Sequence, residues 1–164
     1  MLSRASPGFR LPLFFAAAAL CAFGQNWTAL DRQAEAAYGK GDLKEAIRVA
    51  RLAVAAASDA KQIGRSLDRL GFFQYTAGEL QDGEASLRRA LDLRRDRVGA
   101  ETEDYAESAN DLALLLRDAG RAAEARPLAE EAVAIRRRLL GPRQIPVAES
   151  LNTLGSTLGK LGDY

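Results

Sequence analysis

Apolar residues recur at intervals of three and four along most of the chain, the spacing that places them on one face of an α-helix. The segment around Leu67 and Leu70 shows the pattern most openly, with Gly71 next and Tyr75 one turn later. No segment reads convincingly as a strand. The pattern predicts seven helices, over residues 28–39, 43–57, 61–77, 81–97, 102–118, 122–139 and 147–160.

Glycines at positions 41, 78, 120 and 162 mark turns between these helices, and the intervals between them are 37, 42 and 42. Glycine suits such turns because it adopts backbone conformations that are costly for other residues. The last two units also match elsewhere at the same offset: Arg94 recurs as Arg136, and residues 106–108 recur as 148–150. A fixed period of this length predicts stacked supersecondary units, which usually bind a partner in a long groove rather than catalyse.

Small residues recur in the first helix of successive units, as Gly71, Ala113 and Gly155, where they let the second helix of the unit approach closely. With the Gly-containing turn and the alanines of the second helices, this pattern resembles the tetratricopeptide repeat over about residues 28–164. The resemblance implies an all-α, right-handed superhelical solenoid of about three and a half repeats. We expect a repeat domain over 25–164, with repeats at roughly 27–60, 64–97, 106–139 and, incomplete, 148–164.

The 42-residue period and the segments 124–128, 132–141 and 147–152 are similar to the kinesin-light-chain subtype of this repeat. That subtype tolerates a proline in the second helix, and Pro127 is expected to bend it. Gly83 stands where the second helix usually has alanine, which predicts a weak point of about 1 kcal/mol. Asp42 and Asp163 follow turn glycines and are expected to cap the next helix.

Residues 1–24 have the three-part layout of a secretory signal peptide. A basic start is followed by an apolar run over 11–20 and by small residues before a cut after Gly24. The run is shorter than the about 20 residues of a membrane span. We therefore expect a secreted or periplasmic protein with no stable membrane insertion after cleavage. An uncleaved anchor and a lipoprotein modified at Cys21 are alternatives, although Leu20 stands where a lipoprotein has a small residue.

The composition excludes several classes of function. The net charge is +1, and without the leader 21 basic residues face 22 acidic ones, which gives no support for nucleic-acid binding. The chain has one cysteine and no histidine, so it cannot form a Ser-His-Asp triad, a Cys-His pair or a His-based metal site by itself. We therefore expect no enzyme activity, cofactor or metal. Arginine outnumbers lysine 19 to 4, which indicates a GC-rich bacterial coding bias.

The resemblance implies that a protein or peptide partner binds on the inner, concave wall, which is lined by first-helix side chains that include Asp111. Asn110 and Asn152 occupy the same position in successive units, and asparagines there hold a peptide backbone in the kinesin-light-chain subtype. An amide suits this role because it both donates and accepts; the alternative is a solvated helix residue. Phe72 and Tyr75 are expected either to form an apolar pocket or to pack in the core. The candidate peptide-binding residues are Arg69, Phe72, Tyr75, Asn110, Leu114, Arg117 and Asn152.

Two charge patterns refine this picture. Asp31 and Glu35 stand where repeats that clamp a carboxylate tail carry basic residues and asparagine, which disfavours that activity. Arginines over 88–97 and 136–138 fall near the ends of second helices, where they complement the helix dipole. We expect them to form a solvated face neutralised by nearby acids, with an anion-binding surface as the alternative.

The sequence stops at Tyr164, where the second helix of the fourth repeat would begin. The apolar face formed by Leu151, Leu154 and Leu158 differs from the polar face expected of a closing cap. We therefore expect the N-terminal part of a longer protein. Two functions are open: an exported adaptor, or the recognition arm of a multidomain protein, since arrays of this subtype sometimes precede a caspase-like protease domain.

Overall fold

The computed structural model describes residues 26–162, which form seven α-helices and no strand. Each predicted helix is confirmed, with its ends shifted by no more than two residues. The helices are α2 (Trp27–Gly39), α3 (Leu43–Ala56), α4 (Ala60–Thr76), α5 (Leu80–Arg97), α6 (Glu103–Asp118), α7 (Ala122–Leu140) and α8 (Ile145–Leu161). The predictions for the leader and for Asp163 lie outside the described residues.

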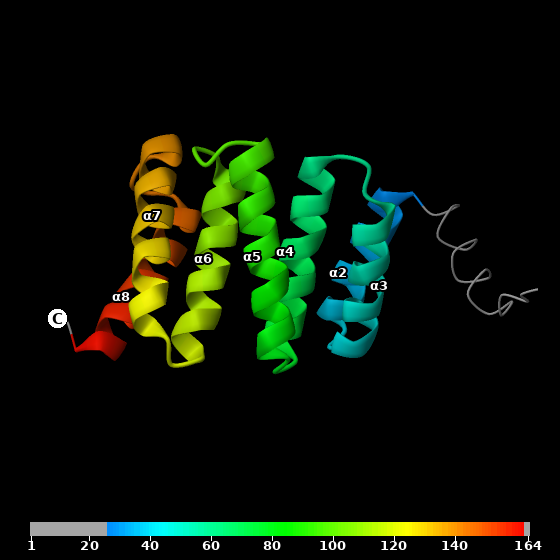
Figure 1. The fold of residues 1–164 in the computed structure, drawn as a ribbon, viewed down its shortest axis with the longest axis horizontal. Helices are drawn as coiled ribbons and strands as arrows, with labels where there is room; N and C mark the ends of the chain where they lie inside the picture. Colours follow the sequence, from blue (N-terminus) through cyan, green and yellow to red (C-terminus); the bar gives the residue numbers. More distant parts are fainter. Residues whose placement is uncertain (1–25, 163–164) are drawn as a thin grey trace, which may run out of the picture.

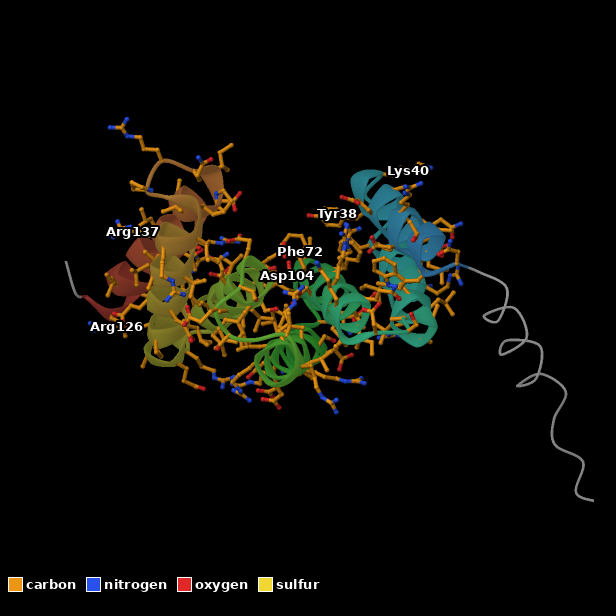
Figure 2. All side chains as sticks on the ribbon, turned by 90° about the horizontal axis from the view of Figure 1, so that it is seen from above. Tyr38, Lys40, Phe72, Asp104, Arg126 and Arg137 are labelled. Atoms are coloured by element: carbon orange, nitrogen blue, oxygen red, sulfur yellow. The ribbon has the colours of Figure 1, made fainter. Side chains whose placement is uncertain are left out.

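The helices form hairpins that stack in a row, as Figure 1 shows. The A helices α2, α4 and α6 pack against the B helices α3, α5 and α7, and α8 packs against α7 and α6. Seen from above in Figure 2, the row is a curved arc whose inner side carries Tyr38, Phe72 and Asp104. The expected all-α stack of helical hairpins is therefore confirmed.

Turn glycines end the A helices as the sequence predicts. Gly41, Gly78 and Gly120 have φ angles of 79°, 81° and 79°, a left-handed conformation that side chains disfavour. Asp42 then caps α3, since its side chain accepts a hydrogen bond from the Glu45 amide at 3.0 Å. The spacing of the repeats thus follows from turn chemistry that is readable in the sequence.

Two further glycines set the distance between α4 and α5. A Cβ on Gly71 would lie 2.6 Å from Leu87 Cγ, and one on Gly83 would lie 3.0 Å from the Gly71 carbonyl oxygen. The expectation of a weak point at Gly83 did not include this close packing, which opposes the roughly 1 kcal/mol of helix propensity that alanine would add. Around Gly155 no atom lies within 4 Å of an added Cβ, and its predicted role towards the second helix of the fourth repeat stays a prediction, because that helix is not among the described residues.

Two arginines of the B helices are buried, which corrects the expectation of a wholly solvated arginine face. Arg94 is 2% exposed and Arg136 is 4% exposed. The Nη1 of Arg94 donates to Ser108 Oγ at 2.7 Å, and that of Arg136 donates to Ser150 Oγ at 2.9 Å. Each Nη1 also donates to the backbone carbonyl four residues before that serine. The same contacts thus recur at equivalent repeat positions and tie the end of a B helix to the start of the next A helix.

The acid that balances each buried guanidinium differs between the repeats. Arg94 Nη1 lies 2.5 Å from Asp68 Oδ2, and both side chains are buried. The next repeat has Asn110 at the position of Asp68. Arg136 therefore finds its acid elsewhere and donates from Nε to Glu103 Oε1 at 2.9 Å. The Glu103 side chain is 37% exposed, so this second pair is less desolvated than the first.

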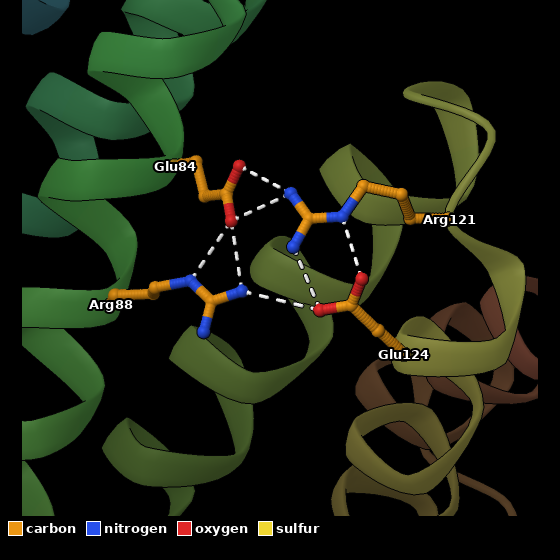
Figure 3. A network of polar contacts seen from close by, with 4 residues as sticks. All are labelled: Glu84, Arg88, Arg121 and Glu124. Carbon is orange, nitrogen blue, oxygen red and sulfur yellow. Dashed lines mark hydrogen bonds and ion pairs between the residues drawn. The ribbon is translucent and has the colours of Figure 1, made fainter.

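An ion-pair network on partly exposed side chains bridges α5 and α7, as drawn in Figure 3. Arg121 Nη1 lies 2.8 and 2.7 Å from the two oxygens of Glu84, and its Nη2 lies 2.7 Å from Glu124. Arg88 completes the network, with Nη2 2.8 Å from Glu84 and 3.6 Å from Glu124. Burial favours a higher pKa for Glu84, but hydrogen bonds from Arg121 and Arg88 outweigh it and lower that pKa. Arg88 thus has the neutralised environment predicted for these arginines, and exposed pairs of this kind add little stability.

Candidate functional site

Two adjoining pockets lie between α4 and α6 on the inner side of the arc, where Figure 2 labels Phe72 and Asp104. One pocket of about 280 Å³ is lined by charged residues, and one of about 260 Å³ includes the ring of Phe72. Of the predicted site residues, Arg69 lines both pockets and Phe72 lines the second. The lining residues of the second pocket are Asp68, Arg69, Phe72, Glu107 and Asp111.

Phe72 belongs to an aromatic cluster that spans α2 and α4. The Tyr38 ring stacks on Phe73 at 4.9 Å between centroids and meets Phe72 edge-on at 5.6 Å. Tyr75 lies 6.4 Å from Phe72. Phe73 is buried, whereas Phe72 and Tyr75 are half-buried. Phe72 therefore packs in the cluster with one part of its ring and faces a pocket with another.

Tyr75 and Arg117 are brought together through Asp118. The Tyr75 hydroxyl donates to one oxygen of Asp118, and Arg117 Nε donates to the other at 2.7 Å. Burial and this hydrogen bond raise the pKa of Tyr75 to about 12. The Tyr75 ring also packs against the hydrophobic core of the third hairpin. The polar groups of these two predicted site residues are thus engaged within the protein.

Asn110 and Asn152 occupy equivalent positions in different surroundings. Asn110 is 8% exposed and its Oδ1 accepts no hydrogen bond, while its Nδ2 reaches only Asp111 Oδ1, at 3.5 Å. Asn152 is exposed on α8. Most buried polar side-chain atoms are hydrogen-bonded, so the Asn110 oxygen is a conspicuous free acceptor. Leu114, one turn further along α6, is half-buried and stands at the repeat position of Phe72.

Charges on α2 and α4 neutralise one another. Arg69 Nε lies 3.2 Å from Asp31 Oδ1, and its Nη1 donates to Glu35 Oε2 at 2.9 Å. Arg65 Nη2 lies 3.3 Å from Asp31 Oδ2. Arg69, a predicted site residue, is thus held in ion pairs that cross from one repeat to the next.

On α6, Glu107 and Asp111 carry charges of the opposite sign at the same repeat positions as Arg65 and Arg69. Neither acid forms an ion pair within residues 26–162. The sequence predicted Asp111 on the inner wall but missed Glu107 and the pocket-lining Arg94. The repeat offset from Arg65 would have identified Glu107. Nothing in the sequence marks Arg94 as buried, because its partners come from the neighbouring helices.

The pKa of Asp111 is strongly raised in the folded chain. Burial and, to a smaller extent, the neighbouring Glu107 raise its pKa to about 7, against the opposing effects of Asn110, Arg136 and Arg94. An unfolded aspartate has a pKa near 3.9. Between about pH 4 and 7 the unfolded chain therefore releases a proton that the folded chain keeps. Stability contributed by this group is lost as the pH rises through that window.

Asp111→Asn is expected to raise the free energy of unfolding by about 1–2 kcal/mol at pH 8 and to leave it unchanged at pH 4. Solvent access to the half-buried group holds the gain below the roughly 4 kcal/mol of the full shift. Urea titrations at several pH values measure this. Asp82→Asn, on an exposed side chain, is the control and should change stability by less than about 0.5 kcal/mol at either pH. A stability gain at pH 4 as large as at pH 8 would contradict the assignment.

Metal binding, membrane insertion and a pocket away from the inner wall are the other possibilities. Within residues 26–162, no group of three or more Asp, Glu, Cys or His residues is arranged to hold a metal ion. No helix in that range has the length and apolar character to cross a membrane. A larger pocket of about 950 Å³ lies between α3 and the turn at 77–79. It contains none of the predicted site residues, so we place the candidate site on the inner wall.

A curved stack of helical hairpins, with glycine turns at a regular period and an inner wall of A-helix side chains, defines a helical-repeat solenoid. The tetratricopeptide repeat model matches residues 62–138 and 104–164, and the chain belongs to that family. Repeats of this family generally serve as non-catalytic scaffolds that bind protein or peptide partners. The predicted family and fold class are therefore confirmed.

Solved structures show the same fold. The chain is similar to BtubC (BKLC) from P. vanneervenii, with 21% identity and a TM-score of 0.72 over 79% of this chain and 53% of that one. It is similar to a putative kinesin light chain with nearly identical TPR-like repeats from Podosopora anserina, with 19% identity and a TM-score of 0.75 over 83% and 67%. A singly substituted form of the latter gives 20% identity and 0.69 over 83% and 66%. The chain thus spans about half to two thirds of these proteins. A search of curated proteins found no match.

Proposed function

We propose that the chain is an exported scaffold that binds an extended segment of a partner protein along its inner wall. The observation that carries this is the buried Asn110 amide, whose Oδ1 has no hydrogen-bond partner. An extended peptide offers a backbone N–H and C=O at each residue, and a side-chain amide can pair with both. Asn152 offers a second amide at the same repeat position. The fold shared with kinesin-light-chain repeats supports a protein partner.

The test removes both amides. Peptides are first selected on the purified chain from a random displayed library, and their affinity is measured by fluorescence anisotropy. Asn110→Ala combined with Asn152→Ala is expected to weaken binding about tenfold or more, the loss of one to two hydrogen bonds of ordinary strength. The melting temperature should stay the same or rise slightly, because Asn110→Ala removes an unsatisfied buried acceptor.

Gln81→Ala serves as the matched control, since it removes an exposed amide from the B helix α5. It should alter neither affinity nor melting temperature. Equal losses of affinity and stability in the double variant would show that the asparagines are structural. Failure of the library to yield any peptide would count against a peptide-binding wall.

Export is proposed from the layout of residues 1–24, and it is tested by the intact mass of the protein from its own cells. A soluble species lacking residues 1–24 would support a secreted or periplasmic protein. A membrane-bound species with a diacylglycerol mass on Cys21 would support the lipoprotein instead. A species much heavier than these 164 residues would favour the alternative of a recognition arm in a longer protein.

A further inference from the structure

One face of α6 concentrates negative charge on the inner wall. Asp104, Glu107 and Asp111 follow one another at intervals of three and four, so they share one face of the helix. Glu107 lines both inner pockets, Asp104 lines one and Asp111 the other. Like charges at this spacing repel one another. The raised pKa of Asp111 accordingly reflects burial first and then the charge of Glu107.

The arginines around these acids are already engaged in ion pairs. Arg65 and Arg69 pair with acids of α2. The buried Arg94 pairs with Asp68. Of the cations that line the two pockets, Lys61 has no ion pair within residues 26–162, and its side chain is exposed on the first turn of α4. The pocket beside Glu107 and Asp111 therefore holds negative charge without an equivalent cation.

The same pocket offers more than charge. Phe72 forms one wall, and the space of about 260 Å³ is smaller than the roughly 300–1,000 Å³ of sites for drug-sized ligands. An aromatic ring beside carboxylates suits a lysine or arginine side chain, because the ring contacts the aliphatic stem and the face of the ring attracts the cation. A bare divalent cation fits less well, since the acids within residues 26–162 form no group arranged to hold a metal.

Asn110 lies next to the pocket residue Asp111 on α6, although it is not itself one of the residues that line the two pockets. Asn110 is nine-tenths buried, its Oδ1 has no partner, and its Nδ2 reaches Asp111. The carboxylates of Glu107 and Asp111, which do line the pocket and have no ion pair within residues 26–162, are what an N–H-rich group would satisfy. A peptide supplies such groups from its backbone and from a basic side chain.

We infer that the pocket between α4 and α6 receives a lysine or arginine side chain of the bound segment, with Glu107 and Asp111 as its counter-charges and Phe72 as its apolar wall. This inference rests on the proposed function and specifies the chemistry of the partner. Where α4 has Arg65 and Arg69, α6 has Glu107 and Asp111. The reversal of sign between adjacent repeats then fixes which part of the wall accepts the basic residue.

The experiment compares peptide selection on three forms of the full chain: the wild type, Glu107→Gln with Asp111→Asn, and a control with Asp82→Asn and Glu130→Gln. The control removes the same charge from exposed positions on B helices. The wild type and the control are expected to enrich lysine or arginine at one fixed peptide position. The pocket variant is expected to retain peptides without that enrichment.

A selected peptide then gives the quantitative test. Replacing its basic residue by norleucine should weaken binding to the wild type at least tenfold and to the pocket variant less than twofold. Between 50 and 500 mM salt, binding of this peptide to the wild type should also weaken more steeply than its binding to the pocket variant. Peptides with no basic preference, or with the same preference on the pocket variant, would overturn this inference and leave the proposed function standing. A wild-type chain that selects no peptide would overturn both.

Discussion

Replacing Arg94 by alanine is expected to lower the free energy of unfolding by about 3–5 kcal/mol at pH 8, the usual effect of removing one partner from a buried ion pair. The residue is 2% exposed, and its guanidinium meets Asp68 at 2.5 Å and Ser108 at 2.7 Å. Without it, Asp68 is left as a buried carboxylate and the link from α5 to α6 is lost. Domains are stable by only about 5–15 kcal/mol, so the loss should be plain in urea titrations.

The pH dependence of this loss identifies its cause. Burial raises the pKa of Asp68, and Arg94 opposes that rise. In Arg94→Ala the pKa of Asp68 should rise further, so that the folded variant holds its proton to a higher pH than the unfolded one. A group of this kind stabilises the folded state at low pH and loses that contribution as the pH rises. The deficit of the variant should therefore shrink from pH 8 to pH 5, and a constant deficit would mean that lost packing dominates.

Three comparisons complete this test. Arg95→Ala removes an exposed arginine paired only with exposed acids and should cost less than about 0.5 kcal/mol. Asp68→Asn introduced with Arg94→Ala should recover part of the loss, because it removes the stranded charge. Arg136→Ala should cost less than Arg94→Ala, since the acid that it leaves behind, Glu103, is 37% exposed on its side chain.

The fold could be read from the sequence because its signals are local. Turn glycines at 41, 78 and 120, and apolar residues at helical spacing, determine each hairpin with little help from the rest of the chain. Helix ends were accordingly placed within two residues. Arg94 shows where local reasoning ends. Its position near a helix C-terminus suits the helix dipole, but its burial depends on Ser108 and Asp68, which belong to other helices.

The candidate site was predictable in register but not in its electrostatics. The repeat offset placed Arg69, Phe72, Asn110 and Asp111 on α4 and α6, whose inner sides line the two pockets. It did not show which charges are paired, because Arg69 meets its acids 34 and 38 residues earlier in the chain. A pairing that crosses repeats is decided by side-chain reach and by the spacing of the hairpins. For the same reason, the sequence alone does not show that Glu107 and Asp111 on α6 lack ion-pair partners within residues 26–162.

Gly71→Ala is expected to lower the free energy of unfolding by about 2–3 kcal/mol, because the added Cβ would lie 2.6 Å from Leu87 Cγ. Gly155→Ala is the matched control, at the same repeat position but with no atom within 4 Å. It should raise stability by up to about 1 kcal/mol through helix propensity. Thermal and urea unfolding measure both, and equal losses at the two sites would contradict a steric cause.

A double variant shows why the second hairpin requires glycine. In the first and third hairpins the positions of Gly71 and Leu87 are both alanine, as in Ala113 and Ala129 of the third. The larger Leu87 therefore occupies the space that a Cβ at position 71 would need. Leu87→Ala alone should cost about 2–5 kcal/mol through a cavity. Combined with Gly71→Ala it should cost less than the sum of the single changes by about 1 kcal/mol or more, because the new methyl partly fills that cavity. Strict additivity would show that the two residues do not share this space.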